Sequence, residues 1–90
     1  MLESAIQKKI LNYLKTIDNC WFIKTISTNR NGTPDIIGVL EGRLFGLEVK
    51  RPGNKPSKIQ EYQLEKIQQA GGLASVVYSV DDVKKLLTLV

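Results

Sequence analysis

Two carboxylates and a lysine of this 90-residue chain have the types and the spacing of a divalent-cation site. Asp35 follows a proline, and Glu48 precedes Lys50 by two residues. If residues 41 and 42 form a two-residue hairpin turn, the register of two antiparallel strands places Asp35 directly opposite Glu48. Opposed β-carbons in a sheet are about 4.5–5.5 Å apart, and like charges at that distance are destabilising. A cation between the two carboxylates would remove that repulsion.

A hard cation such as Mg²⁺ binds the oxygen ligands that this arrangement offers. Asp35 and Glu48 supply carboxylates, and the main-chain carbonyl of Val49 offers a third oxygen. A bound metal lowers the pKa of water and neutralises charge on a phosphate. Lys50 points to the same strand face as Glu48, where it can orient or deprotonate a water or hold the phosphate. The ordinary alternative is that Asp35 begins a strand after Pro34 and that Glu48 pairs with Lys50 on an exposed surface.

Glu3 and Gln60 each allow two interpretations. Glu3 lies on the apolar stripe of an expected helix, so its carboxylate is exposed at the fringe or has a partner within the fold. A glutamate is also favoured in the first turn of any helix. Gln60 is the third helical residue of a capping box that begins at Ser57, and its amide can instead reach a water or a phosphate at the helix N-terminus.

Composition excludes several classes of protein. The chain has no histidine, so Ser-His-Asp triads, Cys-His pairs and His-ligated zinc are impossible, and hydrolysis must depend on carboxylates, lysine and a hard metal. Apolar residues make up 42% and charged residues 24%, which excludes disorder and fits one small domain over residues 1–90. A single cysteine fits a reducing compartment. No apolar run exceeds four residues and no signal peptide opens the chain, so we expect a cytoplasmic protein without membrane contact.

The net charge of +4 is concentrated in one segment. Residues 43–58 hold five basic side chains and one acidic side chain, while the charges of the remaining residues cancel. Such a segment attracts nucleic acid through phosphate contacts and counterion release, although a solvated lysine-rich loop explains the charge equally well. The candidates for phosphate contacts flank the cation site in the sequence: Lys24, Asn29, Arg30, Arg51, Lys55 and Lys58.

Apolar periodicity and turn residues predict seven elements in the order αβββαβα. Helices are expected at residues 3–17, from the Ser57 cap to Gly71, and in a last short segment with Val83, Leu86 and Leu87. Strands are expected at residues 21–27, 35–40, 44–50 and 73–78. Residues 44–78 predict a right-handed parallel crossover, and hence a mixed sheet with helices packed on it. The adjacent Trp21 and Phe22 are expected in the core.

The residues that carry these features also match a known signature. Gly32-Thr33-Pro34-Asp35, followed after twelve residues by Glu48-Val49-Lys50, fits the PD-(D/E)xK nuclease pattern. The chain more closely resembles the virus-type replication-repair nuclease (VRR-NUC) family, whose pattern is an early helical glutamate, a G-x-P-D loop, a glycine hairpin, an E-V-K strand, an S-x-x-Q box and a glycine pair. Almost the whole chain is covered, in order, by Glu3, residues 32–35, Gly42, residues 48–50, Ser57 with Gln60, and Gly71-Gly72.

The resemblance implies an α/β fold with a PD-(D/E)xK, restriction-endonuclease-like core and a mixed central sheet. It implies that Asp35 and Glu48 bind Mg²⁺ or Mn²⁺, that Lys50 is the catalytic lysine, and that Glu3 and Gln60 help to place water. No small-molecule cofactor is implied. Small free-standing members are similar to resolvases that act on branched DNA as homodimers. We therefore expect a Holliday junction resolvase that makes paired nicks, in a bacterial or phage-infected cell.

Other activities stay open from the residues alone. They are a nuclease for flaps or another DNA geometry, a catalytically inactive DNA-binding module, and an RNA-directed nuclease or toxin. The intact acidic pair and lysine speak against the inactive module. A two-fold dimer suits paired incisions. Because the last strand and helix hold more apolar residues than one small core needs, we hypothesise that Leu87 and Leu89 belong to the dimer interface.

Overall fold

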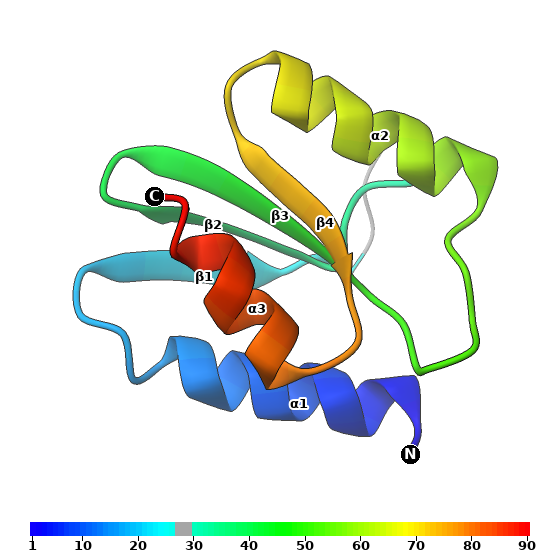
Figure 1. Ribbon diagram of the computed structural model, residues 1–90, viewed down its shortest axis with the longest axis horizontal. Coiled ribbons are helices and arrows are strands. Elements are labelled where there is room, and N and C mark those ends of the chain that lie inside the picture. The colour runs from blue at the N-terminus through cyan, green and yellow to red at the C-terminus, as the bar shows by residue number, and fades with distance from the viewer. Residues whose placement is uncertain (27–29) are drawn as a thin grey trace.

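A computed structural model describes residues 1–26 and 30–90, and its elements follow the order αβββαβα that the sequence predicts (Figure 1). The bounds are α1 Glu3–Leu14, β1 Cys20–Lys24, β2 Ile36–Leu40, β3 Arg43–Val49, α2 Lys58–Gln69, β4 Leu73–Val77 and α3 Val80–Leu87. The predicted α/β class is therefore confirmed.

The strands form one mixed sheet in the order β1-β2-β3-β4. β2 is antiparallel to both β1 and β3, whereas β4 lies parallel to β3, which confirms the parallel pairing expected around α2. The hairpin between β2 and β3 turns through Glu41 and Gly42, whose φ angles of 52° and 78° are those that a two-residue hairpin turn favours. Ile36 consequently faces Leu47, the register that this turn predicts.

Helices α1 and α3 cover one face of the sheet, and α2 packs on the other face (Figure 1). The main core lies under α1 and α3 and consists of Ile6, Ile10, Leu14, Ile36, Phe45, Leu47, Val49, Leu73, Val77, Val83 and Leu87. α2 packs over β3 and β4, where Gly46 leaves space for the helix: a Cβ at this position would lie 3.0 Å from Ile67 Cδ1. Within the described ranges, no helix has the length and apolarity needed to cross a membrane.

Several elements differ in their bounds from the prediction: β2 begins one residue late, at residue 36, and β3 covers residues 43–49 instead of 44–50. α1 ends at Leu14 and not at residue 17, because the N–H groups of Thr16 and Ile17 bond to carbonyls three residues back in tight turns. Ile17 still packs against the core, which explains why the apolar periodicity extends past the helix. β1 covers residues 20–24, so residues 25 and 26 lie outside the strand, and residue 27 lies outside the described residues. β4 ends at residue 77, one residue early.

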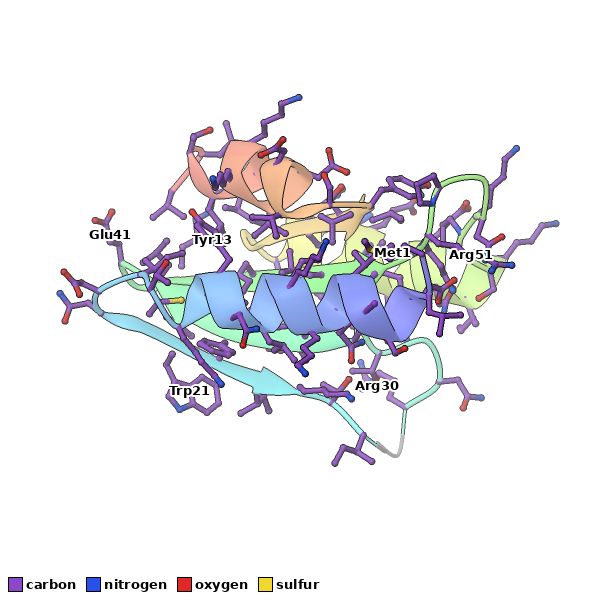
Figure 2. The ribbon with its side chains drawn as sticks, turned by 90° about the horizontal axis from the view of Figure 1, so that it is seen from below. Met1, Tyr13, Trp21, Arg30, Glu41 and Arg51 are labelled. Atoms are coloured by element: carbon purple, nitrogen blue, oxygen red, sulfur yellow. The ribbon has the colours of Figure 1, made fainter. Side chains whose placement is uncertain are left out.

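Several apolar side chains lie elsewhere than expected. Leu87 is buried and belongs to the core, so the hypothesis that it forms a dimer interface is wrong. Leu89 is 61% exposed. Trp21 is 60% exposed, contrary to the expectation of a core position, and Figure 2 shows it pointing away from α1. Phe22, on the opposite strand face, packs against the core as expected.

Arg43 joins three chain segments at the end of the molecule that holds the hairpin turn. Its Nε donates to the Gly71 carbonyl at 3.0 Å, and its Nη1 donates to the Leu89 carbonyl at 2.9 Å. Figure 2 places Glu41, in the same turn, at the opposite end of the molecule from Arg51. One arginine of the basic segment therefore has a structural role far from the others.

Candidate active site

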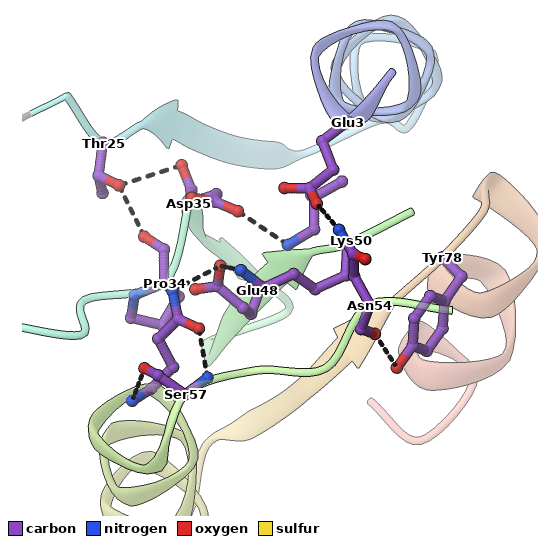
Figure 3. Close-up of polar contacts among 11 residues, drawn as sticks. Glu3, Thr25, Pro34, Asp35, Glu48, Lys50, Asn54, Ser57 and Tyr78 are labelled. Atoms are coloured by element: carbon purple, nitrogen blue, oxygen red, sulfur yellow. Dashed lines mark hydrogen bonds and ion pairs between the residues drawn. The ribbon is translucent and has the colours of Figure 1, made fainter. Parts of the chain in front are cut away.

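Asp35 and Glu48 lie where β2 begins and β3 ends (Figure 3). The antiparallel ladder ends one residue before this pair, and Asp35 precedes β2 instead of starting it. The reason is that its carboxylate takes the place of a main-chain acceptor: Asp35 Oδ2 accepts the Val49 N–H at 2.9 Å. The Thr25 N–H donates to the Asp35 carbonyl at 2.8 Å and holds the main chain from the other side.

Glu48 is the one charged side chain among the described residues that is buried, with 2% of its surface exposed. Its Oε2 lies 3.8 Å from Lys50 Nζ and accepts a hydrogen bond from Gln60 Nε2 at 3.3 Å. Its Oε1 is also buried and has no hydrogen-bond partner within residues 1–26 and 30–90. A buried oxygen without a partner costs about 1–3 kcal/mol. The exposed Glu48–Lys50 surface pair, the ordinary alternative, is therefore wrong.

Burial and a neighbouring carboxyl group both oppose ionisation of Glu48. Desolvation by burial is the larger cause and Asp35 the second, and they raise the pKa of Glu48 from 4.5 to about 8. The Lys50 ammonium lowers this pKa but compensates only in part, and the charge of Glu3 raises it further. A positive charge beside Glu48 would stabilise its ionised form.

The main-chain carbonyl of Val49 points toward the same pair. The Lys50 N–H donates to the Val77 carbonyl of β4 at 3.1 Å. In a planar trans peptide the N–H and the C=O point in opposite directions, so the Val49 carbonyl, which shares that peptide, points away from β4. The Val49 N–H bonds to Asp35, which shows that this residue turns its polar groups toward Asp35.

The oxygen atoms of Asp35, Glu48 and Val49 are suited to bind a hard divalent cation. Two carboxylates and a main-chain carbonyl supply only oxygen, and Oε1 of Glu48 could bind a cation without giving up a hydrogen bond within the described chain. Over the described ranges, no group of three or more histidine, cysteine, aspartate or glutamate side chains is placed to hold a metal. The remaining ligands would have to be main-chain, water or phosphate oxygens, which is usual for Mg²⁺.

Gln60 combines the capping role with a contact to the acidic pair. Its Oε1 accepts the Ser57 N–H at 2.8 Å and its own N–H donates to Ser57 Oγ at 3.3 Å, so the predicted capping box is confirmed. Nε2 of the same amide donates to Glu48. Gly32 allows the loop before Asp35 to approach this helix end, because it has a φ of 79° and a Cβ here would lie 2.6 Å from the Ile59 carbonyl oxygen.

The carboxylate of Glu3 has a partner within the fold. Its Oε2 accepts a hydrogen bond from Asn54 Nδ2 at 3.0 Å. This bond is the largest cause that lowers the pKa of Glu3, and the charges of Lys50 and Arg51 act in the same direction against the effect of burial. The charge of Glu3 also acts on Glu48, so Glu3 borders the acidic pair from α1.

Five of the six basic or polar candidates for phosphate contacts are described, and all five are exposed: Lys24, Arg30, Arg51, Lys55 and Lys58. Figure 2 shows Arg30 and Arg51 at the same end of the molecule. A polar hollow of about 280 Å³ lies beside Asp35, and Arg30 and Thr25 help to line it. Asn29 lies outside the described residues.

Asn54 and Thr25 belong to the site, although the sequence analysis did not identify them. Asn54 follows Pro52-Gly53, in the short stretch between the E-V-K strand and the capping box. A polar residue at that position, between two parts of the site, could have indicated a site residue. Thr25 lies just past β1, and nothing in its type or spacing indicates a contact with Asp35.

Two solved structures share this architecture. A structure described as a VRR_NUC domain has a TM-score of 0.79 and 27% sequence identity, and the match covers 96% of this chain and 94% of that chain. A second, described as a VRR_NUC domain protein, has a TM-score of 0.82 and 19% identity, with 99% of this chain and 87% of that chain covered. No protein-family model and no curated protein sequence matches the chain. The similarity to VRR_NUC domains therefore rests on the comparison of structures.

A mixed four-stranded sheet that brings Asp35, Glu48 and Lys50 together at one end defines the PD-(D/E)xK class of α/β domains. Within that class, the chain has the fold of the two VRR_NUC domain structures, as its ordered motifs predict.

Proposed function

We propose that this VRR-NUC domain is a metal-dependent DNA endonuclease that hydrolyses phosphodiester bonds in branched DNA. The observation that carries the proposal is the buried Glu48, whose Oε1 has no hydrogen-bond partner in the described chain while its Oε2 lies 3.8 Å from Lys50. A buried acid with a raised pKa, next to a second acid and a lysine, destabilises a fold and is typical of catalytic sites.

Asp35, Glu48 and the Val49 carbonyl would hold Mg²⁺, and Mn²⁺ would use the same ligands. When bound, the cation lowers the pKa of water and neutralises charge that develops on the phosphate. The surrounding chain keeps these ligands in place. The Val49 N–H fixes one carboxylate, and the Gln60 amide fixes the other.

Lys50 has two possible roles in this reaction. Its ammonium is largely shielded, with 16% of the side chain exposed, and lies beside Glu48. An amine in this position either holds a phosphate oxygen or accepts a proton from the attacking water. Glu3 from α1 and Gln60 from α2 then support the placement of that water.

The exposed basic side chains near the site would bind the DNA backbone. Lys24 and Arg30 lie on the β1 side, and Arg51, Lys55 and Lys58 lie on the connection between β3 and α2 and at the start of α2. Phosphate contacts position DNA without reading its bases. This suits an enzyme that recognises the shape of a branch.

Among DNA endonucleases, we favour a Holliday junction resolvase that acts as a homodimer. The chain has an accessible surface of 5767 Å². Specific DNA interfaces bury about 1,000–2,500 Å² of protein, so one chain has little surface with which to hold two duplex arms. A two-fold dimer provides both the surface and two active sites in matched positions for paired incisions.

The test is cleavage of a labelled four-way junction, beside a flap, a linear duplex and an RNA hairpin, in Mg²⁺, Mn²⁺ or EDTA. We expect paired symmetric nicks in Mg²⁺, none in EDTA, and a rate at least about 10²-fold lower for Asp35→Asn. Asp18→Asn removes an exposed acid away from the site and should cleave like the wild type. Junction binding without nicks in either metal would contradict the endonuclease, and preferential cleavage of flaps or RNA would contradict the resolvase.

A further inference from the structure

The side chain of Asn54 connects the segment between β3 and α2 to the first turn of α1. Its Nδ2 donates to Glu3 Oε2 at 3.0 Å, although the two residues are 51 positions apart in the sequence. The same bond is the largest influence that keeps the pKa of Glu3 low, ahead of the charges of Lys50 and Arg51. The state of the Glu3 carboxylate therefore depends on Asn54.

Asn54 is itself held from two sides. Its N–H donates to the Arg51 carbonyl at 3.0 Å and closes a turn through Pro52 and Gly53. Proline suits the second position of a type II turn, and the third requires a positive φ, which Gly53 supplies at 93°. The Asn54 carbonyl accepts a hydrogen bond from Tyr78 Oη at 3.3 Å, just past β4. Figure 3 shows the resulting series from Glu3 through Asn54 to Tyr78.

The turn that positions Asn54 also carries basic side chains. Arg51 opens the turn and Lys55 follows it, and both are exposed. Lys50, directly before the turn, contacts Glu48 at 3.8 Å. A DNA phosphate bound by Arg51 or Lys55 would therefore act on the segment that holds Glu3 in place.

We propose that Asn54 is a positioning residue of this site. Its amide holds the Glu3 carboxylate at the border of the acidic pair, and its turn links that carboxylate to the phosphate contacts of Arg51 and Lys55. The inference rests on the proposed nuclease function. Because Asn54 acts through Glu3, loss of its amide matters only while the Glu3 carboxylate is present.

A double-mutant cycle with Asn54→Asp and Glu3→Gln tests this inference. Asn54→Asp keeps the size of the side chain and removes the donor. In single-turnover cleavage of a four-way junction, we expect Asn54→Asp to lower the maximal rate by about 10–100-fold. The DNA concentration that gives half of the maximal rate should change little. In the Glu3→Gln background, the same substitution should change the rate by no more than about twofold. Asn12→Asp makes the same charge change at an exposed position of α1 and should keep the wild-type rate.

A second measurement does not depend on cleavage. NMR titration of the Glu3 carboxyl should show a higher pKa in Asn54→Asp than in the wild type, and no such rise in Asn12→Asp. A wild-type rate for Asn54→Asp, an equal loss in both backgrounds, or an unchanged pKa of Glu3 would each overturn the positioning role. Failure of the proposed function is distinguishable, because then the wild-type protein itself would cleave no DNA in either metal.

Discussion

Protonation of Glu48 couples the stability of the fold to pH. Its pKa is raised from 4.5 to about 8 by burial and by Asp35, so the folded protein holds this proton more tightly than the unfolded chain does. The contribution to stability is fully present below pH 4.5 and is lost as the pH rises through about 8. We therefore expect the unfolding free energy of the metal-free protein to decrease between these two values, as measured by urea denaturation in EDTA.

Two variants separate the causes of this pH dependence. Glu48→Gln has no proton to lose and should flatten the profile. Asp35→Asn removes one neighbouring charge, so it should lower the pKa of Glu48 and shift the decrease to lower pH. If the wild type and Glu48→Gln showed the same profile, the raised pKa would be wrong.

The acidic pair could be found from the sequence because its geometry is local. A two-residue turn determines the register of the hairpin, and that register, continued one residue past the ladder, places Asp35 opposite Glu48. The partner of Glu3 could not be found in this way. Its contact with Asn54 spans 51 residues and depends on how α1 and the turn after β3 meet in the folded protein.

At the scale of the element, the first turn of α2 combines a cap with a contact to Glu48, and two substitutions separate them. Ser57→Ala removes the hydroxyl that accepts the Gln60 N–H and should cost about 0.5–2 kcal/mol of stability. The Ser57 N–H still bonds to the Gln60 side chain in this variant, so the contact with Glu48 is kept. We expect near-normal cleavage per folded molecule, measured below the midpoint of unfolding.

Gln60→Ala is the matched variant, because it removes both the reciprocal half of the cap and the hydrogen bond to Glu48. Its maximal cleavage rate should decrease by about 10-fold or more, as expected for loss of a group that orients a proposed metal ligand. Equal rates for Ser57→Ala and Gln60→Ala would show that Gln60 serves the helix alone.

Element types were predictable because turn and capping residues stand at most of the boundaries, whereas some ends depend on packing. The capping box at Ser57 places the start of α2 correctly. Ile17 continues the apolar spacing of α1 but reaches the core from a turn, so periodicity alone extends the helix too far. Asp35 lies outside β2 because its side-chain oxygen, and not its main-chain carbonyl, accepts the Val49 N–H. Strand propensity does not indicate a bond of this kind.

At the scale of the whole molecule, one sheet face remains partly uncovered. Trp21, Ile23 and Leu44 are 60%, 46% and 40% exposed. Trp21 pairs with Val39, and Val39 pairs with Leu44, so these side chains form a row on one face. Strand alternation places Glu48 on the same face. Composition reveals the surplus of apolar residues. Only the fold shows that the exposed apolar side chains lie on this sheet face and that Leu87 is buried in the core.

The proposed homodimer should use this row of exposed apolar side chains. A stable interface buries about 800 Å² on each partner, and the row offers three exposed apolar side chains from neighbouring strands toward such an area. We therefore expect Trp21→Glu to sediment as a monomer and Leu89→Glu to sediment like the wild type. A dimeric Trp21→Glu together with a monomeric Leu89→Glu would place the interface at the C-terminal end of the chain instead.

Arg43 should not contribute to the salt dependence of DNA binding, although it belongs to the basic segment. Each phosphate that a protein neutralises contributes about 0.9 to the slope of log affinity against log salt. Arg43 donates to the Gly71 and Leu89 carbonyls at the far end of the molecule, so its charge is not available to the DNA. Arg43→Met should leave that slope unchanged, whereas Arg51→Met should reduce it by about one unit. The slope of this salt dependence thus reports how many basic side chains contact the DNA phosphates.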